Sequence, residues 1–269
     1  MPEILDYFRI SIESIDDPVV FFGEPLHDVS DVISIKELQD IEFSLHKAPL
    51  STIIEYNQLD SMAARILKRI LAICTTHTDS EGYVDDLSKH LLEAFGYDNG
   101  ELLISSQESL QLEMCNGMTS ARPDVCVLNS ELLIKLLVQE DKSFKTYPKR
   151  NAIANAESQV IAEAIAAFQD NEKMREALSL PKKASHLIPC ITMIGTRPTF
   201  YLVNVTTALA DAVKRGEEPA EETVCQRFSI SPTFLPQGDA MLSKDVRLKI
   251  FQCYATFKKF VLESNESIW

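Results

Sequence analysis

The sequence predicts an α/β protein in which a mixed central β-sheet is flanked by helices. Short runs of branched apolar residues between polar turns are typical of buried strands. Such runs occur at 125–128, 132–139, 186–195 and 199–205. Helical patterns at 78–95 and 152–169 precede and follow the first two runs. Strands that alternate with helices favour a sheet covered by helices, with further helices packed on the core.

Local signals define the predicted helices. The helix at 78–95 opens with a capping box, Thr78-Asp-Ser-Glu81, and Gly96 is placed to end it. The helix at 152–169 is rich in alanine and contains little charge, so we expect it to be buried. Ser243 caps a final amphipathic helix, whose polar side, which includes Arg247, we expect to be solvated.

Length and composition indicate a globular protein. The chain has 269 residues, of which 45% are hydrophobic and 25% charged, and no apolar run has the length of a membrane span. The N-terminal residues lack the pattern of a secretory signal, and six scattered cysteines suit reduced core thiols. We therefore expect an intracellular protein, nuclear or cytoplasmic, without a membrane partner. Cysteines and histidines show no zinc-site spacing.

The negative charge is concentrated at the N-terminus. Residues 1–60 contain thirteen acidic and three basic residues, a balance of −10 within a total of −14. We expect an acidic N-terminal arm at 1–50, either a solubilising tail or a cover for a basic groove, and a domain at 51–269. The rest of the chain is close to neutral and can still present a locally positive cleft to nucleic acid.

Two short motifs suggest a metal site. Pro123-Asp124 opens the first strand of the central pair, and Glu140-Asp141-Lys142 ends the second. Strand alternation places Ile134, Leu136, Val138, Glu140 and Lys142 on one face, with Asp124 within reach if its strand pairs alongside. Carboxylates can hold Mg²⁺ or Mn²⁺, and a lysine can neutralise charge on a phosphate. The alternative is a turn aspartate and a solvated strand end.

Further candidates lie outside this strand pair, each with a structural alternative. Glu81 extends the inward face of its helix, or is only a capping glutamate. Gln159 lies on a face of the alanine-rich helix that carries small residues, where it could join a site. The alternative is that its amide is hydrogen-bonded only by backbone groups. A basic stretch could contact a nucleic-acid backbone, or could form a solvated loop; its candidate residues are Lys145, Lys149 and Arg150.

With these motifs in this order, the chain resembles the PD-(D/E)XK nuclease superfamily, which has the restriction-endonuclease-like fold. The resemblance covers about residues 78–205, and its later part is similar to a large group of uncharacterised fungal proteins. It implies that Glu81, Asp124 and Glu140 ligate the metal. It also implies that Lys142 assists and that Gln159 joins them.

The expected function is therefore Mg²⁺-dependent hydrolysis of phosphodiester bonds in nucleic acid, with DNA favoured over RNA. The alternative is a catalytically idle, nuclease-derived binding or protein-interaction module. A small-molecule enzyme finds no support, because the chain lacks a glycine-rich phosphate loop and a GxSxG elbow. The sequence leaves homo-oligomerisation open.

Overall fold

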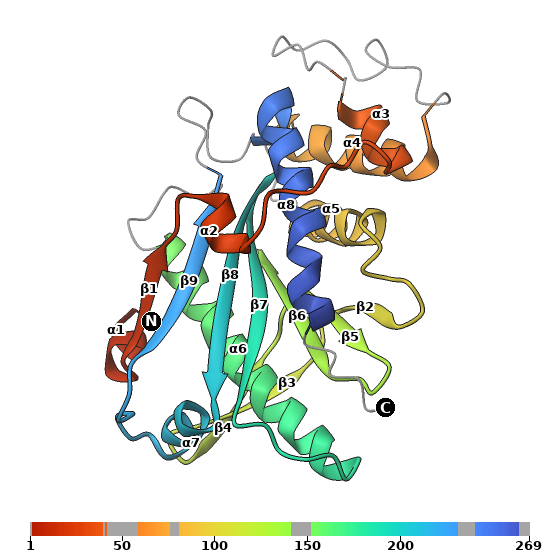
Figure 1. The fold of residues 1–269 in the computed structure, drawn as a ribbon. Coiled ribbons are helices and arrows are strands. Elements are labelled where there is room, and N and C mark those ends of the chain that lie inside the picture. The colour runs from red at the N-terminus through yellow and green to blue at the C-terminus, as the bar shows by residue number, and fades with distance from the viewer. Residues whose placement is uncertain are drawn as a thin grey trace.

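A mixed β-sheet forms the centre of the protein, with helices on both faces (Figure 1). The structure is a computed structural model that describes residues 2–39, 41, 59–75, 81–140, 152–230 and 240–263. Within these residues the sheet has seven strands in the order β1-β9-β8-β7-β6-β5-β2. The prediction of an α/β fold with a mixed sheet flanked by helices is confirmed.

The strands pair in both directions. The pairs β1–β9 and β6–β7 are parallel, and the other neighbours are antiparallel. The strands are β1 (Ile10–Ser14), β2 (Leu102–Ser106), β5 (Val125–Asn129), β6 (Ile134–Glu140), β7 (Ser185–Ile194), β8 (Arg197–Thr206) and β9 (Thr223–Ser229). A separate hairpin consists of β3 (Leu110–Met114) and β4 (Gly117–Ala121).

Each face of the sheet is covered by its own group of helices and its own apolar cluster. One face carries α2 (Pro18–Phe22), α3 (Ile33–Gln39), α4 (Ser61–Thr75), α5 (Glu81–Ala94) and α8 (Lys244–Glu263). The other carries α1 (Pro2–Tyr7), α6 (Ala152–Ala177), α7 (Thr207–Arg215) and the β3–β4 hairpin. No described helix has the length and apolarity needed to cross a membrane.

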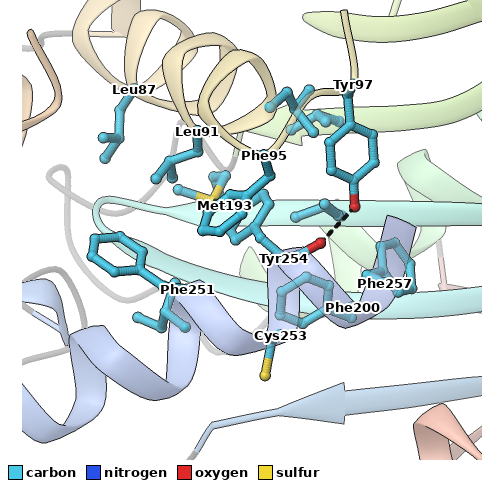
Figure 2. Close-up of a cluster of buried hydrophobic side chains, with 14 of the residues drawn as sticks. Leu87, Leu91, Phe95, Tyr97, Met193, Phe200, Phe251, Cys253, Tyr254 and Phe257 are labelled. Atoms are coloured by element: carbon cyan, nitrogen blue, oxygen red, sulfur yellow. Dashed lines mark hydrogen bonds between the residues drawn. The ribbon is translucent and has the colours of Figure 1, made fainter. Parts of the chain in front are cut away.

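Aromatic side chains fill the core beneath α8 (Figure 2). The rings of Phe95 and Tyr254 stack at 6.0 Å, and Phe200 meets Tyr254 edge-on at 5.5 Å. The buried hydroxyl of Tyr97 donates to the carbonyl oxygen of Tyr254 at 2.8 Å. This cluster fixes α5 and α8 on the sheet.

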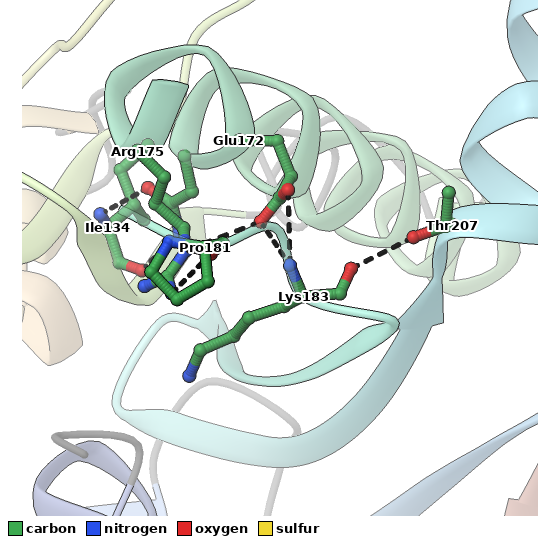
Figure 3. Close-up of polar contacts among 7 residues, drawn as sticks. Ile134, Glu172, Arg175, Pro181, Lys183 and Thr207 are labelled. Atoms are coloured by element: carbon green, nitrogen blue, oxygen red, sulfur yellow. Dashed lines mark hydrogen bonds and ion pairs between the residues drawn. The ribbon is translucent and has the colours of Figure 1, made fainter. Parts of the chain in front are cut away.

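Helix α6 is the crossover between the parallel strands β6 and β7, a connection that parallel pairing requires. The Asn171 side chain accepts a hydrogen bond from the backbone amide of Ile134 at 2.7 Å and donates one to its carbonyl oxygen at 2.9 Å. After the helix, Arg175 donates to the carbonyl of Pro181, and Glu172 accepts from the backbone amide of Lys183 (Figure 3). The position of α6 over the sheet is therefore fixed at its C-terminal half.

The first 39 residues contribute directly to this architecture. Strand β1 pairs with β9 at the edge of the sheet, and Phe21 and Phe22 are buried in the core. Helix α3 adds the buried side chains of Ile35 and Leu38. Acidic composition at the N-terminus does not reveal this, because the apolar residues that enter the core lie in short runs between the acids.

The alternation predicted for β6 is wrong at Ile134. The register with β5 shifts between Val127 and Leu128, where Leu128 pairs with Ile134 although Val127 pairs with Leu136. The extra residue on β6 is Lys135, and a bulge of this kind reverses the face of the residues before it. Ile134 therefore packs on the α6 face, whereas Leu136 packs on the α8 face.

The prediction that Arg247 is solvated is also wrong. Its side chain is fully buried and donates to backbone carbonyls of Leu38, Met241 and Ile41. Burial lowers the pKa of this guanidinium to about 10. Arg247 joins the end of α3 to the turn before α8.

Candidate functional site

Asp124 lies immediately before β5, at the end of the sheet where β6 finishes. Its side chain is almost entirely buried. Val125 of β5 pairs with Val138 of β6. Because the strands are antiparallel, the residue before Val125, Asp124, lies opposite Gln139. The Gln139 amide donates a hydrogen bond of 2.9 Å to Asp124 Oδ2. The carboxylate therefore has a defined orientation on the α6 face.

A second acid, Glu163, approaches the same place from α6. Its side chain is 1% exposed, and Gln159, one helical turn earlier, donates to its Oε1 at 3.2 Å. Burial raises the pKa of Glu163 to about 8, and the charge of Asp124 adds to the rise, whereas the Gln159 hydrogen bond opposes it. Within the described residues, Glu163 Oε2 is buried without a hydrogen-bond partner.

The polar residues continue across the sheet beneath the first turns of α6. Thr192 pairs with Gln139, and its hydroxyl lies 3.4 Å from that of Tyr201. Tyr201 donates to Glu157 of α6 at 3.2 Å, and Arg227 of β9 forms a 2.6 Å ion pair with the same carboxylate. These contacts attach the N-terminal half of α6 to the sheet, so Gln159 and Glu163 are positioned by the fold itself.

Two of the predicted site residues, Asp124 and Gln159, act on Glu163. Gln159 donates a hydrogen bond to its carboxyl group, and the charge of Asp124 raises its pKa. Glu140 ends β6 and pairs through its backbone with Met193, and Glu81 begins α5. The side chains of both glutamates lie outside the described part of the structure. The other predicted positions also lie outside the described residues: Lys142, Lys145, Lys149 and Arg150.

The β6 side chain placed against Asp124 is Gln139. Val138 packs on the opposite, α8 face, and so does Met193, the backbone partner of Glu140. The sequence analysis missed Gln139 and Glu163. A signal for Glu163 was present: it is one of the few charges on a buried helix, and its four-residue spacing from Gln159 places both on one face.

A cavity of about 440 Å³ lies beside Gln159 and Glu163. It lies between α6, the β3–β4 hairpin and the α1–β1 segment. Apolar side chains line most of it, Gln159 and Glu163 form part of its wall, and Arg122, two residues before Asp124, lies on its lining.

The described residues contain no group of three or more His, Cys, Asp or Glu side chains arranged to hold a metal ion. The pair Asp124 and Glu163 is therefore the part of a candidate metal site that can be described, and the side chains of Glu81 and Glu140 are outside that search. No protein-family model matches the sequence, and no curated protein matches it.

Proposed function

We propose that this protein is a metal-dependent nuclease that hydrolyses phosphodiester bonds of nucleic acid, with DNA favoured over RNA. The main support is the buried carboxyl pair, Asp124 and Glu163, in which Glu163 Oε2 has no hydrogen-bond partner among the described residues. Buried charges are stable in proteins when they are paired or coordinate a metal. The pair is therefore suited to a divalent cation.

The order of elements supports the same proposal. Helix α5 is followed by β2, the Pro-Asp strand β5, the acid-x-Lys strand β6, the buried helix α6 and β7. In the sheet, these four strands are neighbours in the order β2-β5-β6-β7. This arrangement brings the Pro-Asp motif, the end of β6 and the start of α6 to one end of the sheet (Figure 1), which supports the proposal of a shared site there.

The donor set fits Mg²⁺ or Mn²⁺, which prefer hard oxygen ligands. In the proposed site Asp124 and Glu163 would hold the metal. The resemblance adds Glu140 and Glu81 as further ligands, and their side chains lie outside the described part of the structure. A bound ion of this kind lowers the pKa of a water molecule and stabilises charge on a phosphate. Gln139 orients Asp124, Gln159 orients Glu163, and Lys142 is assigned to orient the nucleophile.

The decisive experiment combines cleavage with metal binding. Single- and double-stranded DNA and RNA are incubated with the protein and Mg²⁺ or Mn²⁺, beside a nuclease of known activity. We expect cleavage by the wild type and none by Asp124→Asn, with calorimetry showing that the variant also loses metal binding. The matched control is Asp211→Asn, an exposed aspartate on α7, which should retain both.

The outcomes separate the proposal from its alternative. If all DNA and RNA substrates stayed intact under these conditions, the nuclease proposal would be overturned. If metal binding were also absent, or unaffected by Asp124→Asn, the catalytically idle binding module would be favoured instead.

A further inference from the structure

The cavity beside the carboxyl pair has fixed walls. The Tyr7 hydroxyl donates to the carbonyl of Gly216 at 2.9 Å, which holds α1 against the end of α7. Gln169 of α6 accepts from the backbone amide of Glu113 at 2.8 Å and donates to its carbonyl at 3.1 Å, which holds the β3–β4 hairpin. A cavity with anchored walls keeps its shape without a ligand, as small-molecule sites usually do.

The lining of the cavity divides into an apolar part and a polar edge. Leu5, Phe8, Leu112 and Ile165 contribute apolar surface, including one aromatic ring. The polar edge contains Gln159 and Glu163, which are joined by a hydrogen bond, and Arg122, two residues before Asp124, is also part of the lining. A planar group with apolar faces and a hydrogen-bonding rim matches this division.

The position of the cavity identifies such a group. If the scissile phosphate lies at Asp124 and Glu163, the cavity is adjacent to that phosphate, and the nearest parts of the substrate are the sugar and base of a flanking nucleotide. Its volume of about 440 Å³ falls within the range of small-molecule sites. Arg122 on the lining can meet a phosphate of the same strand.

We infer that the cavity binds one unpaired nucleobase of the substrate, and that the enzyme therefore acts on single strands or on unpaired nucleotides. The inference rests on the proposed nuclease function and specifies its substrate class. A base inside a duplex reaches an enclosed pocket only after it is unpaired and unstacked, which costs free energy that a single strand does not pay. Contact of a base with aromatic and apolar side chains is favourable for every base, so the cavity need not select a sequence.

Binding of small ligands tests the cavity separately from catalysis. Deoxynucleoside 5′-monophosphates and deoxyribose 5-phosphate, which lacks the base, are titrated into the full chain in the presence of Mg²⁺ and followed by calorimetry. We expect the nucleotides to bind about tenfold more tightly, the contribution of one stacked base. Equal affinity for the two kinds of phosphate would overturn the inference.

A variant that fills the cavity supplies the second arm. Ala162 of α6 lines the cavity and is half-buried, so Ala162→Phe should remove the preference for ligands that contain a base. Ala121→Phe, from β4 on the opposite wall, serves the same purpose if the first variant does not fold. The matched control, Ala64→Phe, changes a half-buried alanine of α4 on the other face of the sheet and should leave the preference intact.

Cleavage of one oligonucleotide, alone and annealed to its complement, supplies the third arm. We expect the single strand to be cut at least about tenfold faster, since the duplex must first unpair a base. Equal rates, or unchanged single-strand cleavage and base preference in both cavity variants, would overturn the inference while the nuclease proposal stands. Base-dependent binding without cleavage of any substrate would overturn the nuclease and leave a nucleotide-binding site.

Discussion

The side-chain amide of Gln139 donates to Asp124 Oδ2 at 2.9 Å, across the antiparallel strands β5 and β6. Gln139 is 2% exposed and Asp124 9%, so both ends of this contact are shielded from water. A buried donor that orients a carboxylate before a ligand arrives reduces the reorganisation that binding requires.

Replacing Gln139 should weaken metal binding without removing a ligand. Partners that orient metal ligands typically contribute about 10- to 100-fold in affinity, and we expect a loss of this size for Gln139→Leu. Calorimetric titration with Mn²⁺ measures it. The control is Gln169→Leu, which removes a structural side-chain amide of α6 and should lower stability while leaving the Mn²⁺ affinity unchanged. Equal Mn²⁺ affinities for the wild type and Gln139→Leu would contradict an orienting role for Gln139.

Glu163→Gln should stabilise the metal-free protein above mildly acidic pH. The folded-state pKa of Glu163 is raised to about 8 from an ordinary value of 4.5, so between these values the folded chain binds more protons than the unfolded chain. The free energy of unfolding therefore falls as pH rises through this window, by up to about 1.4 kcal/mol per pH unit. Glutamine removes this dependence, and urea denaturation at a series of pH values measures the change.

Two comparisons make the Glu163 prediction specific. Glu176→Gln, an exposed position on the same helix, should change stability by less than about 0.5 kcal/mol at any pH. Added Mg²⁺ should raise the melting temperature of the wild type and have little effect on Glu163→Gln. If Glu163→Gln were less stable than the wild type at pH 8 without metal, the ionised Glu163 carboxylate would already be stabilised by other groups in the folded protein.

His186 should make the protein acid-sensitive in a different pH range. Burial, followed by the charges of Lys135, Lys183 and Arg175, lowers its pKa to about 3, and its Nε2 is buried without a partner in the described residues. The unfolded chain binds a proton near pH 6.5, whereas the folded chain does not until about pH 3. Stability is therefore lost as pH falls through this interval, by up to about 1.4 kcal/mol per unit.

The contribution of His186 is obtained by difference, because carboxylates also titrate in this range. His186→Gln should show a shallower loss of stability between pH 6.5 and 4 than the wild type, measured by urea denaturation. Parallel pH profiles for the two proteins would show that the imidazole is protonated in the folded state as readily as in the unfolded state.

Arg247→Met should destabilise the protein strongly. It removes donors from the carbonyl oxygens of Leu38, Met241 and Ile41. Buried acceptors left without a donor cost about 1–3 kcal/mol each, so we expect a loss of at least about 2 kcal/mol in chemical denaturation. Lys249→Met, at an exposed position of the same helix, should change stability by less than about 0.5 kcal/mol. Equal effects of the two substitutions would contradict a structural role for Arg247.

Periodicity was sufficient to predict the central strand pair and α6, because branched apolar runs and an alanine-rich pattern need no knowledge of their partners. Periodicity failed where contacts with another segment determine which face a side chain occupies or whether it is buried. The bulge at Lys135 depends on how β5 and β6 align, so the face of Ile134 could not be obtained by counting along one strand. Arg247 has the composition of a surface residue, and only the carbonyls of distant segments make its burial favourable.

The candidate site shows the same division. The Pro-Asp motif identified Asp124 as a candidate and the alanine-rich helix identified Gln159, and the roles of both residues stay predictions. The sequence shows Glu163 on the same helix face as Gln159, but the effect of Asp124 on it depends on the docking of α6 and not on local sequence. The contacts of Asn171 with Ile134 and of Glu157 with Arg227 determine that docking, and each joins residues far apart in the chain.

The parallel pairing of β1 with β9 has a consequence for how the chain is made. Arg227 of β9 is 213 residues from Ser14 of β1, and these two side chains are in direct contact. On the ribosome β1 emerges long before β9, its only described neighbour in the sheet. Closing so long a loop is entropically costly, so β1 is expected to join the sheet late. Until it does, Phe8 and the α1 wall of the cavity have no fixed place, and ligand-binding competence becomes one of the final events of folding.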